Sequence, residues 1–328
     1  MTARPQPHER GRAPQKFASL TLGVDGGGTK TQAVLADEKG RAVGEGLAGA
    51  SNPLRVGVGA AVTAISEAFH RALERAGARR SDVAAAEVGL AGVRREDLRE
   101  RMREELSALG VAAVEVVTDG EIALYGATNG EPGLVLIAGT GSICCGKNAR
   151  GRHACAGGWG PIVGDEGGGS WIARRALVAV ARSTDGRGRR TSLAESCLEY
   201  FNIESAEDLS TAIYAPAVTN ERIAGFAKYV IEGAEEGDEV ACAIMRDAAC
   251  ELADAACAVI KKLHMERDKF QVAYVGGVFR AGELVLAPLG ERLARVAARA
   301  YLAPPHLPPA LAAARMARAH LPKLAMAG

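Results

Sequence analysis

Three consecutive glycines between two apolar strands are the feature that most constrains how this chain can fold. The apolar run 22–24 and Asp25 precede Gly26, Gly27 and Gly28, and the apolar run 33–36 follows them. A strand on each side places the glycines in the bend of a β-hairpin. Glycine tolerates positive φ and lets backbone N–H groups approach an anion closely. The bend is therefore predicted to bind phosphate.

The residues after the glycines exclude two commoner phosphate motifs. A P-loop needs Gly-Lys-Ser/Thr in direct succession and then a helix, but Thr29 separates Gly28 from Lys30. A Rossmann fingerprint also continues into a helix, whereas a strand follows here. A third interpretation, a tight hairpin turn that binds no ligand, is not excluded, although such a turn needs at most two glycines. We favour a phosphate site, with hydroxyl donors from Thr29 and Thr31 and a carboxylate for Mg²⁺ from Asp25.

The same arrangement recurs further along the chain. The apolar strand 134–137 leads into Gly139-Thr140-Gly141-Ser142, and 143–146 is predicted to return as a strand. A third turn at Gly276-Gly277 follows another apolar strand and is predicted to open a helix. Each turn is weak evidence by itself. Their order along the chain indicates a nucleotide site built from several glycine turns.

Composition and charge favour a small-molecule partner. The chain has 328 residues, 48% of them hydrophobic, and a formal net charge of +1. This balance gives no reason to expect nucleic acid or an anionic membrane surface as a partner. No apolar run approaches the roughly 18 residues that span a bilayer. Residues 1–17, rich in Arg and Pro, are predicted to be a disordered tail without the apolar core of a secretory signal.

The cysteines point to a reducing compartment. Seven cysteines without even spacing in a chain of this length do not resemble a disulfide framework. We therefore predict a cytoplasmic protein. Cys144 and Cys145 would face opposite sides of their strand, which disfavours joint ligation of a metal or cluster.

Strands alternate with helices, which predicts an α/β fold with largely parallel sheets. Ligands in such sheets bind at the carboxyl ends of strands, where Asp25, Asp119 and Thr140 are expected. Residues 176–263 are mostly helical by pattern, and a last helix at 310–320 is expected to return to the first lobe. The predicted domains are an N-terminal lobe of 18–118 plus 307–328 and a C-terminal lobe of 119–306.

Taken in order, these motifs resemble the actin, sugar-kinase and Hsp70 superfamily. Three further segments, Asp119-Gly120-Glu121, Gly157-Gly158-Trp159-Gly160 and Gly164-Asp165-Glu166-Gly167, resemble the N-acetylglucosamine kinase branch of the BadF/BadG/BcrA/BcrD ATPase family. The resemblance extends from about residue 20 to about residue 320. It implies a two-lobed, actin-like (ribonuclease H-like) fold, with ATP and a sugar bound in the interlobe cleft.

The resemblance implies transfer of the γ-phosphate of ATP to a sugar hydroxyl, expected to be the 6-hydroxyl. Asp119 would be the catalytic base and Asp25 would hold Mg²⁺. The implied nucleotide residues are Gly26, Gly27, Gly28, Thr29, Lys30, Thr140, Gly141, Gly225, Gly276, Gly277 and Ala281. The implied sugar residues are Asn52, Asp119, Ser142, Gly158, Trp159, Gly160 and Asp165.

Several of these residues also have a purely structural interpretation. Asp119 suits a helix N-cap, Asn52 suits a turn, and Lys30 suits a solvated surface charge. Two departures from the family pattern bear on specificity. Ala281 stands where a polar residue would contact adenosine, which leaves nucleotide preference open. Ile143 stands where an asparagine is expected, so N-acetylglucosamine, glucosamine, N-acetylmuramic acid, N-acetylmannosamine and glucose all stay open as substrates.

Two other functions are compatible with the same fold. One is an ATPase that activates a 2-hydroxyacyl-CoA dehydratase or a benzoyl-CoA reductase type system, which needs cysteines for a cluster shared by a dimer. The other is a non-catalytic sugar sensor, against which the intact Asp25 and Asp119 argue. A homodimer is expected only by family analogy. Closure of the lobes around sugar and nucleotide is a further hypothesis.

Overall fold

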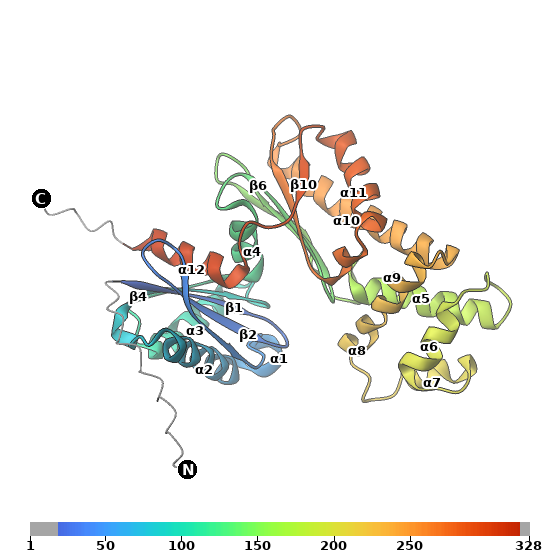
Figure 1. The fold of residues 1–328 in the computed structure, drawn as a ribbon, viewed down its shortest axis with the longest axis horizontal. Coiled ribbons are helices and arrows are strands. Elements are labelled where there is room, and N and C mark those ends of the chain that lie inside the picture. Colours follow the sequence, from blue (N-terminus) through green and yellow to red (C-terminus); the bar gives the residue numbers. More distant parts are fainter. Residues whose placement is uncertain (1–18, 322–328) are drawn as a thin grey trace, which may run out of the picture. The chain divides into compact units, whose positions relative to one another are not determined.

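The structure is a computed structural model that describes residues 19–321 (Figure 1). The predicted tail at 1–17 lies outside the described residues. The chain divides into two compact units, one of residues 1–126 with 307–328 and one of residues 127–306. Each unit contains a five-stranded mixed sheet with helices packed against it. The predicted α/β class is confirmed.

The sheet of the first unit has the strand order β3-β2-β1-β4-β5. The first three strands form an antiparallel meander, and β4 and β5 add to β1 in parallel. The glycine bend joins β1 to β2, as the sequence predicts. The strands are β1 (Leu20–Gly26), β2 (Thr31–Ala36), β3 (Ala42–Ala48), β4 (Val83–Leu90) and β5 (Ala113–Thr118).

Helices cover both faces of this sheet, α12 on one and α2 with α3 on the other (Figure 1). Glycines in the strands allow the close approach. A Cβ on Gly23 would collide with the backbone of α12 at Ala310, and one on Gly46 would collide with α2 at Ala68. The helices are α1 (Pro53–Val56), α2 (Val58–Ala76), α3 (Glu96–Leu106), α4 (Asp119–Thr128) and α12 (Pro309–His320), with short 3₁₀ turns η1 (Arg80–Asp82) and η2 (Ser107–Leu109).

The first unit includes most of α4. The sequence places the domain boundary at 118/119, whereas the compact units divide after Gly126. The reason is packing: Ile122 is fully buried and lies against Gly89 of β4, and the backbone N–H of Leu307 donates to the carbonyl oxygen of Gly126 at 2.9 Å. The start of α4 is thus part of the first core.

The sheet of the second unit has the order β10-β9-β6-β7-β8. Strands β10, β9 and β6 are parallel, and β6, β7 and β8 form an antiparallel meander. The second glycine bend joins β6 to β7. The strands are β6 (Gly133–Ala138), β7 (Ser142–Lys147), β8 (His153–Gly157), β9 (Gln271–Val275) and β10 (Tyr301–Ala303).

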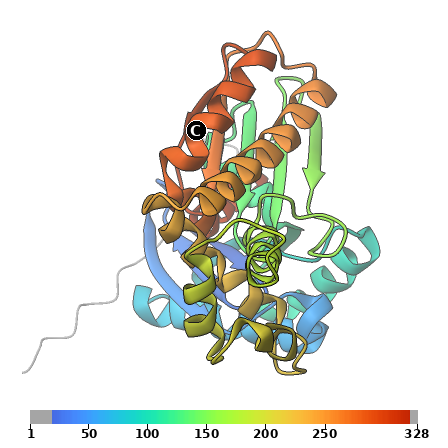
Figure 2. The same ribbon diagram turned by 90° about the vertical axis from the view of Figure 1, so that its right-hand side faces the viewer.

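The long helix α10 crosses this sheet, and α11 packs beside it (Figure 2). The buried face of α10 is rich in alanine, whose small side chain lets neighbouring helices pack close. Residues 176–263 are mostly helical, as predicted. The helices are α5 (Gly169–Thr184), α6 (Leu193–Phe201), α7 (Leu209–Ile213), α8 (Asn220–Gly225), α9 (Ala227–Glu235), α10 (Glu239–Leu263) and α11 (Glu283–Val296), with 3₁₀ turns η3 (Ala206–Asp208) and η4 (Gly277–Ala281).

One cysteine pair forms a disulfide, although the spacing of the seven cysteines does not resemble a disulfide framework. Cys145 on β7 and Cys155 on β8 are opposite each other in the antiparallel register and are joined by a disulfide, with Cα atoms 4.2 Å apart. Cys144 is free and fully buried. The pairing depends on the strand register, which a spacing of ten residues does not reveal.

Candidate active site

The first glycine bend is closed by backbone hydrogen bonds. The N–H of Gly27 donates to the carbonyl oxygen of Lys30 at 2.9 Å, and the carbonyl of Gly27 accepts from the N–H groups of Ser51 and Asn52. Gly26, Gly27 and Gly28 all lack positive φ, contrary to the conformational reason we gave for them. At Gly26 the reason is space, because a Cβ would collide with Ser51 and with Leu90.

The two threonines of the bend have different roles. Thr29 is exposed, so its hydroxyl is accessible to a ligand, and Lys30 beside it is exposed as well. Thr31 is fully buried, and its hydroxyl donates to the carbonyl of Gly49 at 2.6 Å and lies 2.8 Å from the hydroxyl of Ser51. The prediction of Thr31 as a phosphate donor is therefore wrong. Its hydroxyl anchors the bend to the segment after β3.

Two carboxylates lie at the same edge of the first sheet. Asp25 pairs with Gly89 in β4, which pairs with Val117 in β5, and Asp119 follows β5 directly. Burial and then the neighbouring Asp119 raise the pKa of Asp25 to about 6, against the opposing effect of Lys30. A partly buried carboxylate next to another is poised to take a cation or a proton.

Asp119 is the first residue of α4, but it does not cap that helix. Thr118 and Glu121 form the cap: the carboxylate of Glu121 accepts from the N–H and the hydroxyl of Thr118, both at 2.8 Å. Asp119 Oδ1 accepts from the N–H of Gly120 at 2.9 Å, and its side chain is exposed. Desolvation by the surrounding protein nevertheless raises its pKa, which suits a group that accepts a proton.

The side-chain oxygen of Asn52 has a structural role, whereas its side-chain NH₂ is available to a ligand. Its side-chain oxygen caps α1 by accepting from the N–H of Leu54 at 3.0 Å, as the turn interpretation predicts. The same oxygen lies against Gly92, where a Cβ would collide with it. The side-chain NH₂ makes no hydrogen bond to the described part of the protein. It is the atom that could donate to a ligand.

The second glycine bend is locked to the N-terminus of α5. The N–H of Gly139 donates to the carbonyl of Gly141 at 2.9 Å, which closes the turn. The N–H groups of Gly169 and Ser170 donate to the carbonyls of Gly139 and Thr140 at 2.7 and 2.9 Å. The first donors of the helix are thus used to fix the bend.

Asp165 organises the segment after β8. It has a φ of +59°, its carboxylate accepts from the N–H of Gly160 at 3.3 Å, and it lies against Gly141, whose Cβ would collide with it. Desolvation raises its pKa in spite of hydrogen bonds from the N–H groups of Gly160 and Ser142. Asp165 therefore ties the second bend to the Gly158-Trp159-Gly160 turn.

Ser142 and Gly158 complete this cluster. The Ser142 hydroxyl donates to the carbonyl of Glu166 at 2.6 Å, and its own carbonyl accepts from the N–H of Gly158 at 2.8 Å. Trp159 is 70% exposed, so its indole is not part of the core. The side chain of Ile143 packs against Gly158, since a Cβ placed on Gly158 would lie 2.9 Å from Ile143 Cδ1. The structure thus brings Ser142, Gly158, Gly160 and Asp165 together around an exposed tryptophan.

The third glycine turn meets the second one. Gly276 has a φ of +121°, and a Cβ on it would collide with the carbonyl of Ala138. Gly277 faces open space and Ala281 is buried. Gly225 lies against the ring of Tyr200, whose hydroxyl donates to the carbonyl of Arg222 at 2.7 Å. Packing against Tyr200 therefore explains the glycine at position 225 without a ligand.

Comparisons with known proteins place the chain among its relatives. Residues 22–310 match the BadF/BadG/BcrA/BcrD ATPase family. The chain belongs to this family.

Its relatives are named for amino-sugar kinases. An N-acetylmuramic acid/N-acetylglucosamine kinase from Clostridium acetobutylicum is 34% identical over 78% of this chain and 84% of its own length. An N-acetyl-D-glucosamine kinase from Dictyostelium discoideum is 33% identical over 79% and 85%. The structure of a putative N-acetylglucosamine kinase from Chromobacterium violaceum superposes with a TM-score of 0.73 at 29% identity, covering 90% of this chain and 98% of that one. Membership of the family implies use of ATP.

Sequence reasoning missed the supports of the site in this family member. The cap formed by Thr118 and Glu121 follows the Ser/Thr-x-x-Glu pattern and was readable. The locking of the second bend by Gly169 and Ser170 was not, because it joins segments 30 residues apart in the chain. Among the described residues, no helix is both long and apolar enough to cross a membrane.

The residues of the first unit fit a magnesium ion. Asp25 has no hydrogen-bond donor among the described residues, and burial followed by the proximity of Asp119 raises its pKa. A divalent cation would offset the desolvation and relieve the repulsion of the pair. Carboxylate oxygens, with water, are the donors that Mg²⁺ prefers. Within residues 19–321 no group of three or more His, Cys, Asp or Glu side chains could hold a metal ion, so the remaining ligands here would be water and phosphate oxygens.

Proposed function

We propose that this family member is an ATP-dependent sugar kinase that phosphorylates a hydroxyl, expected to be the 6-hydroxyl, of an amino sugar or hexose. The observation that carries the proposal is the pair of carboxylates, Asp25 and Asp119, at one sheet edge beside the first glycine bend. The substrate class is supported by the relatives, one named as an N-acetylmuramic acid/N-acetylglucosamine kinase and one as an N-acetyl-D-glucosamine kinase.

Asp119 is the general base. Phosphoryl transfer needs a carboxylate within reach of the attacking hydroxyl, and a raised pKa matches that proton acceptor to a pH nearer neutrality. Because Thr118 and Glu121 cap α4, the free oxygen of Asp119 is not needed for helix stability. Its exposed side chain can therefore accept the proton directly.

Asp25 holds the magnesium ion. When bound, Mg²⁺ neutralises charge on the β- and γ-phosphates of ATP. The first bend offers Thr29 and the backbone of Gly28, both accessible, to the phosphates. The second bend, at Thr140 and Gly141, and the third, at Gly276 and Gly277, are the other proposed nucleotide residues, and both are rigidly supported within the second unit.

The sugar is bound by the amide of Asn52 and by the cluster around Asp165. The carboxylate of Asp165 accepts hydrogen bonds from sugar hydroxyls, and the exposed Trp159 offers an apolar surface to a sugar face. Ile143, packed beside Gly158, presents an apolar group where a polar side chain would otherwise discriminate between sugars. We therefore propose a site that tolerates variation among amino sugars.

The activator function has less support. Its cluster needs free cysteines at a subunit surface. Of the three cysteines that lie together on β7 and β8, Cys145 and Cys155 are bonded to each other and Cys144 is buried. Burial holds the pKa of Cys144 well above its usual range, so it is not a thiolate ligand. The cytoplasmic location and the homodimer stay predictions.

The test is ADP release with ATP and Mg²⁺ against N-acetylglucosamine, glucosamine, N-acetylmuramic acid, N-acetylmannosamine and glucose. We expect stimulation by at least one sugar in the wild-type protein and in Asp97→Asn, a control at an exposed aspartate of the same unit. Asp119→Asn should abolish it. ATP hydrolysis that no sugar stimulates would refute the kinase proposal and favour the activator.

A further inference from the structure

A large hollow in the second unit plays no part in the proposed reaction. It lies between α5 and the first half of α10 and has a volume of about 820 Å³. We call it the α5/α10 hollow. A single face of α5 lines it, from Trp171 through Val178 to Arg182, and Arg189 of the following loop closes one end. Ligand pockets of drug-sized molecules have about 300–1,000 Å³, so the hollow can hold a whole small molecule.

The lining carries a surplus of positive charge. Four arginines face two carboxylates: Arg175 pairs with Asp247 at 3.0 Å, and Arg189 pairs with Glu239 at 2.6 Å. Arg174 and Arg182 form no ion pair within residues 19–321. The nearby Asp185 already pairs with Arg187 at 2.6 Å. Arg182 also donates to the backbone carbonyl of Arg187 at 3.2 Å, so its charge is not neutralised by an ion pair. Guanidinium is the side chain best matched to phosphate.

The rest of the lining is apolar. Val178, Val240 and Ile244 lie between the charged groups, and the guanidinium of Arg175 is 5.4 Å from the centre of the Trp171 ring. Val178 is 58% exposed, so it presents apolar surface to the hollow. An apolar floor with arginines around it matches a ligand that has a ring-bearing body and an anionic end.

The spacing of the arginines sets the size of that ligand. Arg174 and Arg182 are eight residues apart on one helix, which separates their Cα atoms by about 12 Å along the axis. A single inorganic phosphate would contact both only if the two side chains bent toward each other. A phosphate ester of nucleotide size, with a second anionic group or a sugar hydroxyl at its far end, can contact both.

We propose that the α5/α10 hollow binds a ring-bearing phosphate ester, either a nucleoside diphosphate or a sugar phosphate, at a site distinct from the glycine bends. Arg174 and Arg182 bind the phosphoryl oxygens, and the body lies against Val178 and Val240. This proposal does not depend on the kinase activity. It adds a second anion site to the same unit.

The test measures binding to the intact chain by titration calorimetry. The probes are uridine diphosphate, glucosamine 6-phosphate and inorganic phosphate, each added in the presence of a saturating non-hydrolysable ATP analogue and Mg²⁺. We expect uridine diphosphate or glucosamine 6-phosphate to bind with a Kd below about 1 mM, and inorganic phosphate at least about tenfold more weakly. The stronger of the two esters identifies the source of the phosphoryl group.

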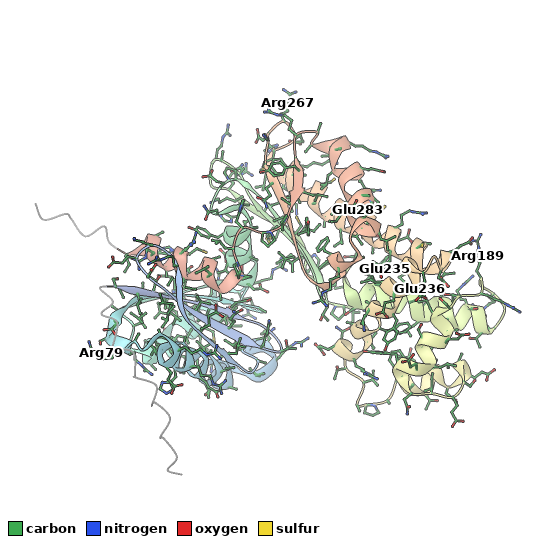
Figure 3. All side chains as sticks on the ribbon, in the orientation of Figure 1. Arg79, Arg189, Glu235, Glu236, Arg267 and Glu283 are labelled. Atoms are coloured by element: carbon green, nitrogen blue, oxygen red, sulfur yellow. A yellow bond between two sulfur atoms is a disulfide. The ribbon has the colours of Figure 1, made fainter. Side chains whose placement is uncertain are left out.

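Two variants change the hollow in independent ways. The double variant Arg174→Ala, Arg182→Ala removes the two arginines assigned to the phosphoryl oxygens, and Ala243→Trp fills the space while keeping every arginine. Both should weaken binding at least about tenfold. The matched control is Arg267→Ala, which removes an arginine from the far end of the same unit (Figure 3). It should leave the affinity unchanged.

Binding that is equal in the wild type and in both variants would place the ligand elsewhere and overturn the proposal. So would the absence of binding by all three probes. Circular dichroism and the thermal midpoint of each variant show that it is folded, so a loss of binding is assigned to the hollow. Basal ADP release in Ala243→Trp should equal that of the wild type, since the hollow is outside the proposed reaction.

Discussion

The two units contain similar glycine bends, both closed by backbone hydrogen bonds, with different groups beside them. In the first unit the bend lies beside ionisable groups, Asp25 and Asp119, and a third carboxylate, Glu87, is buried in β4 between their strands. In the second unit the bend accepts backbone hydrogen bonds from Gly169 and Ser170 at the start of α5, and the Asp165 carboxylate lies against Gly141. The first bend therefore lies beside a pair of carboxylates, and the second is held by the N-terminus of a helix.

Removing the proposed base should have the largest effect. Asp119→Asn keeps the shape and the hydrogen bond to Gly120 but cannot accept a proton, so kcat should fall about 10²–10⁴-fold with little change in KM. Steady-state kinetics with the best sugar measure this. A fall of less than tenfold would mean that Asp119 is not the general base.

The stability of the first unit should depend on pH through Glu87. Its side chain is 1% exposed, and burial, followed by Glu115 and Glu121, raises its pKa from 4.5 to about 7, while His320 approaches its Oε2 at 3.4 Å. The raised pKa means that the folded protein prefers the protonated form. The stabilisation is complete below about pH 4.5 and is lost as pH rises through 7, by about 3 kcal/mol at most.

Glu87→Gln isolates that effect, because glutamine stays neutral at every pH. Denaturant unfolding between pH 5 and pH 8 should show that the variant loses less stability than the wild type over this range. Glu38→Gln, at an exposed glutamate of the same unit, is the matched control. Parallel curves for wild type and Glu87→Gln would contradict the assignment.

Steric change should separate the two bends. A Cβ on Gly141 would collide with the Asp165 carboxylate, whereas one on Gly27 would come no closer than 3.4 Å to the carbonyl of Lys30. Gly141→Ala should therefore raise the KM for sugar about tenfold by displacing Asp165, a loss of about 1.4 kcal/mol in binding. Gly27→Ala should change KM less than threefold. Equal effects at the two glycines would remove the distinction between the bends.

The smallest predicted effect concerns the metal. The pKa of Asp25 is about 6 without a cation, so protons compete with Mg²⁺ as the pH falls from 7.5 to 5.5. The Mg²⁺ concentration for half-maximal activity should rise about threefold or more across this interval, since the ionised fraction of Asp25 falls from nearly all at pH 7.5 to about a quarter at pH 5.5. Activity titrations with Mg²⁺ at fixed ATP test this. A constant requirement would show that Asp25 does not contact the ion.

Much of the fold was predictable because its signals are local. The glycine bend at 26–28, the strand 134–137 and the helical region 176–263 are each specified by residues that are neighbours in the chain. The positions of Asp25 and Asp119 at strand ends were predictable for the same reason, because parallel strands bring their carboxyl ends to one edge. Chemistry carried by one short segment can be inferred from that segment.

Other features depended on partners far along the chain. Thr31 looked like a ligand donor by position, but its hydroxyl is used by Gly49 and Ser51. Cys145 and Cys155 pair because the β7–β8 register places them opposite each other.

The sequence by itself determined the glycine bends, the alternation of strands and helices, and the carboxylates available at strand ends. Only the tertiary structure decided which polar groups are used internally, where α4 joins the first core, and that α5 and α10 enclose a hollow with four arginines. The physical reason is range: backbone propensity acts within a few residues, whereas hydrogen-bond partners, strand register and charge surplus arise when distant segments meet.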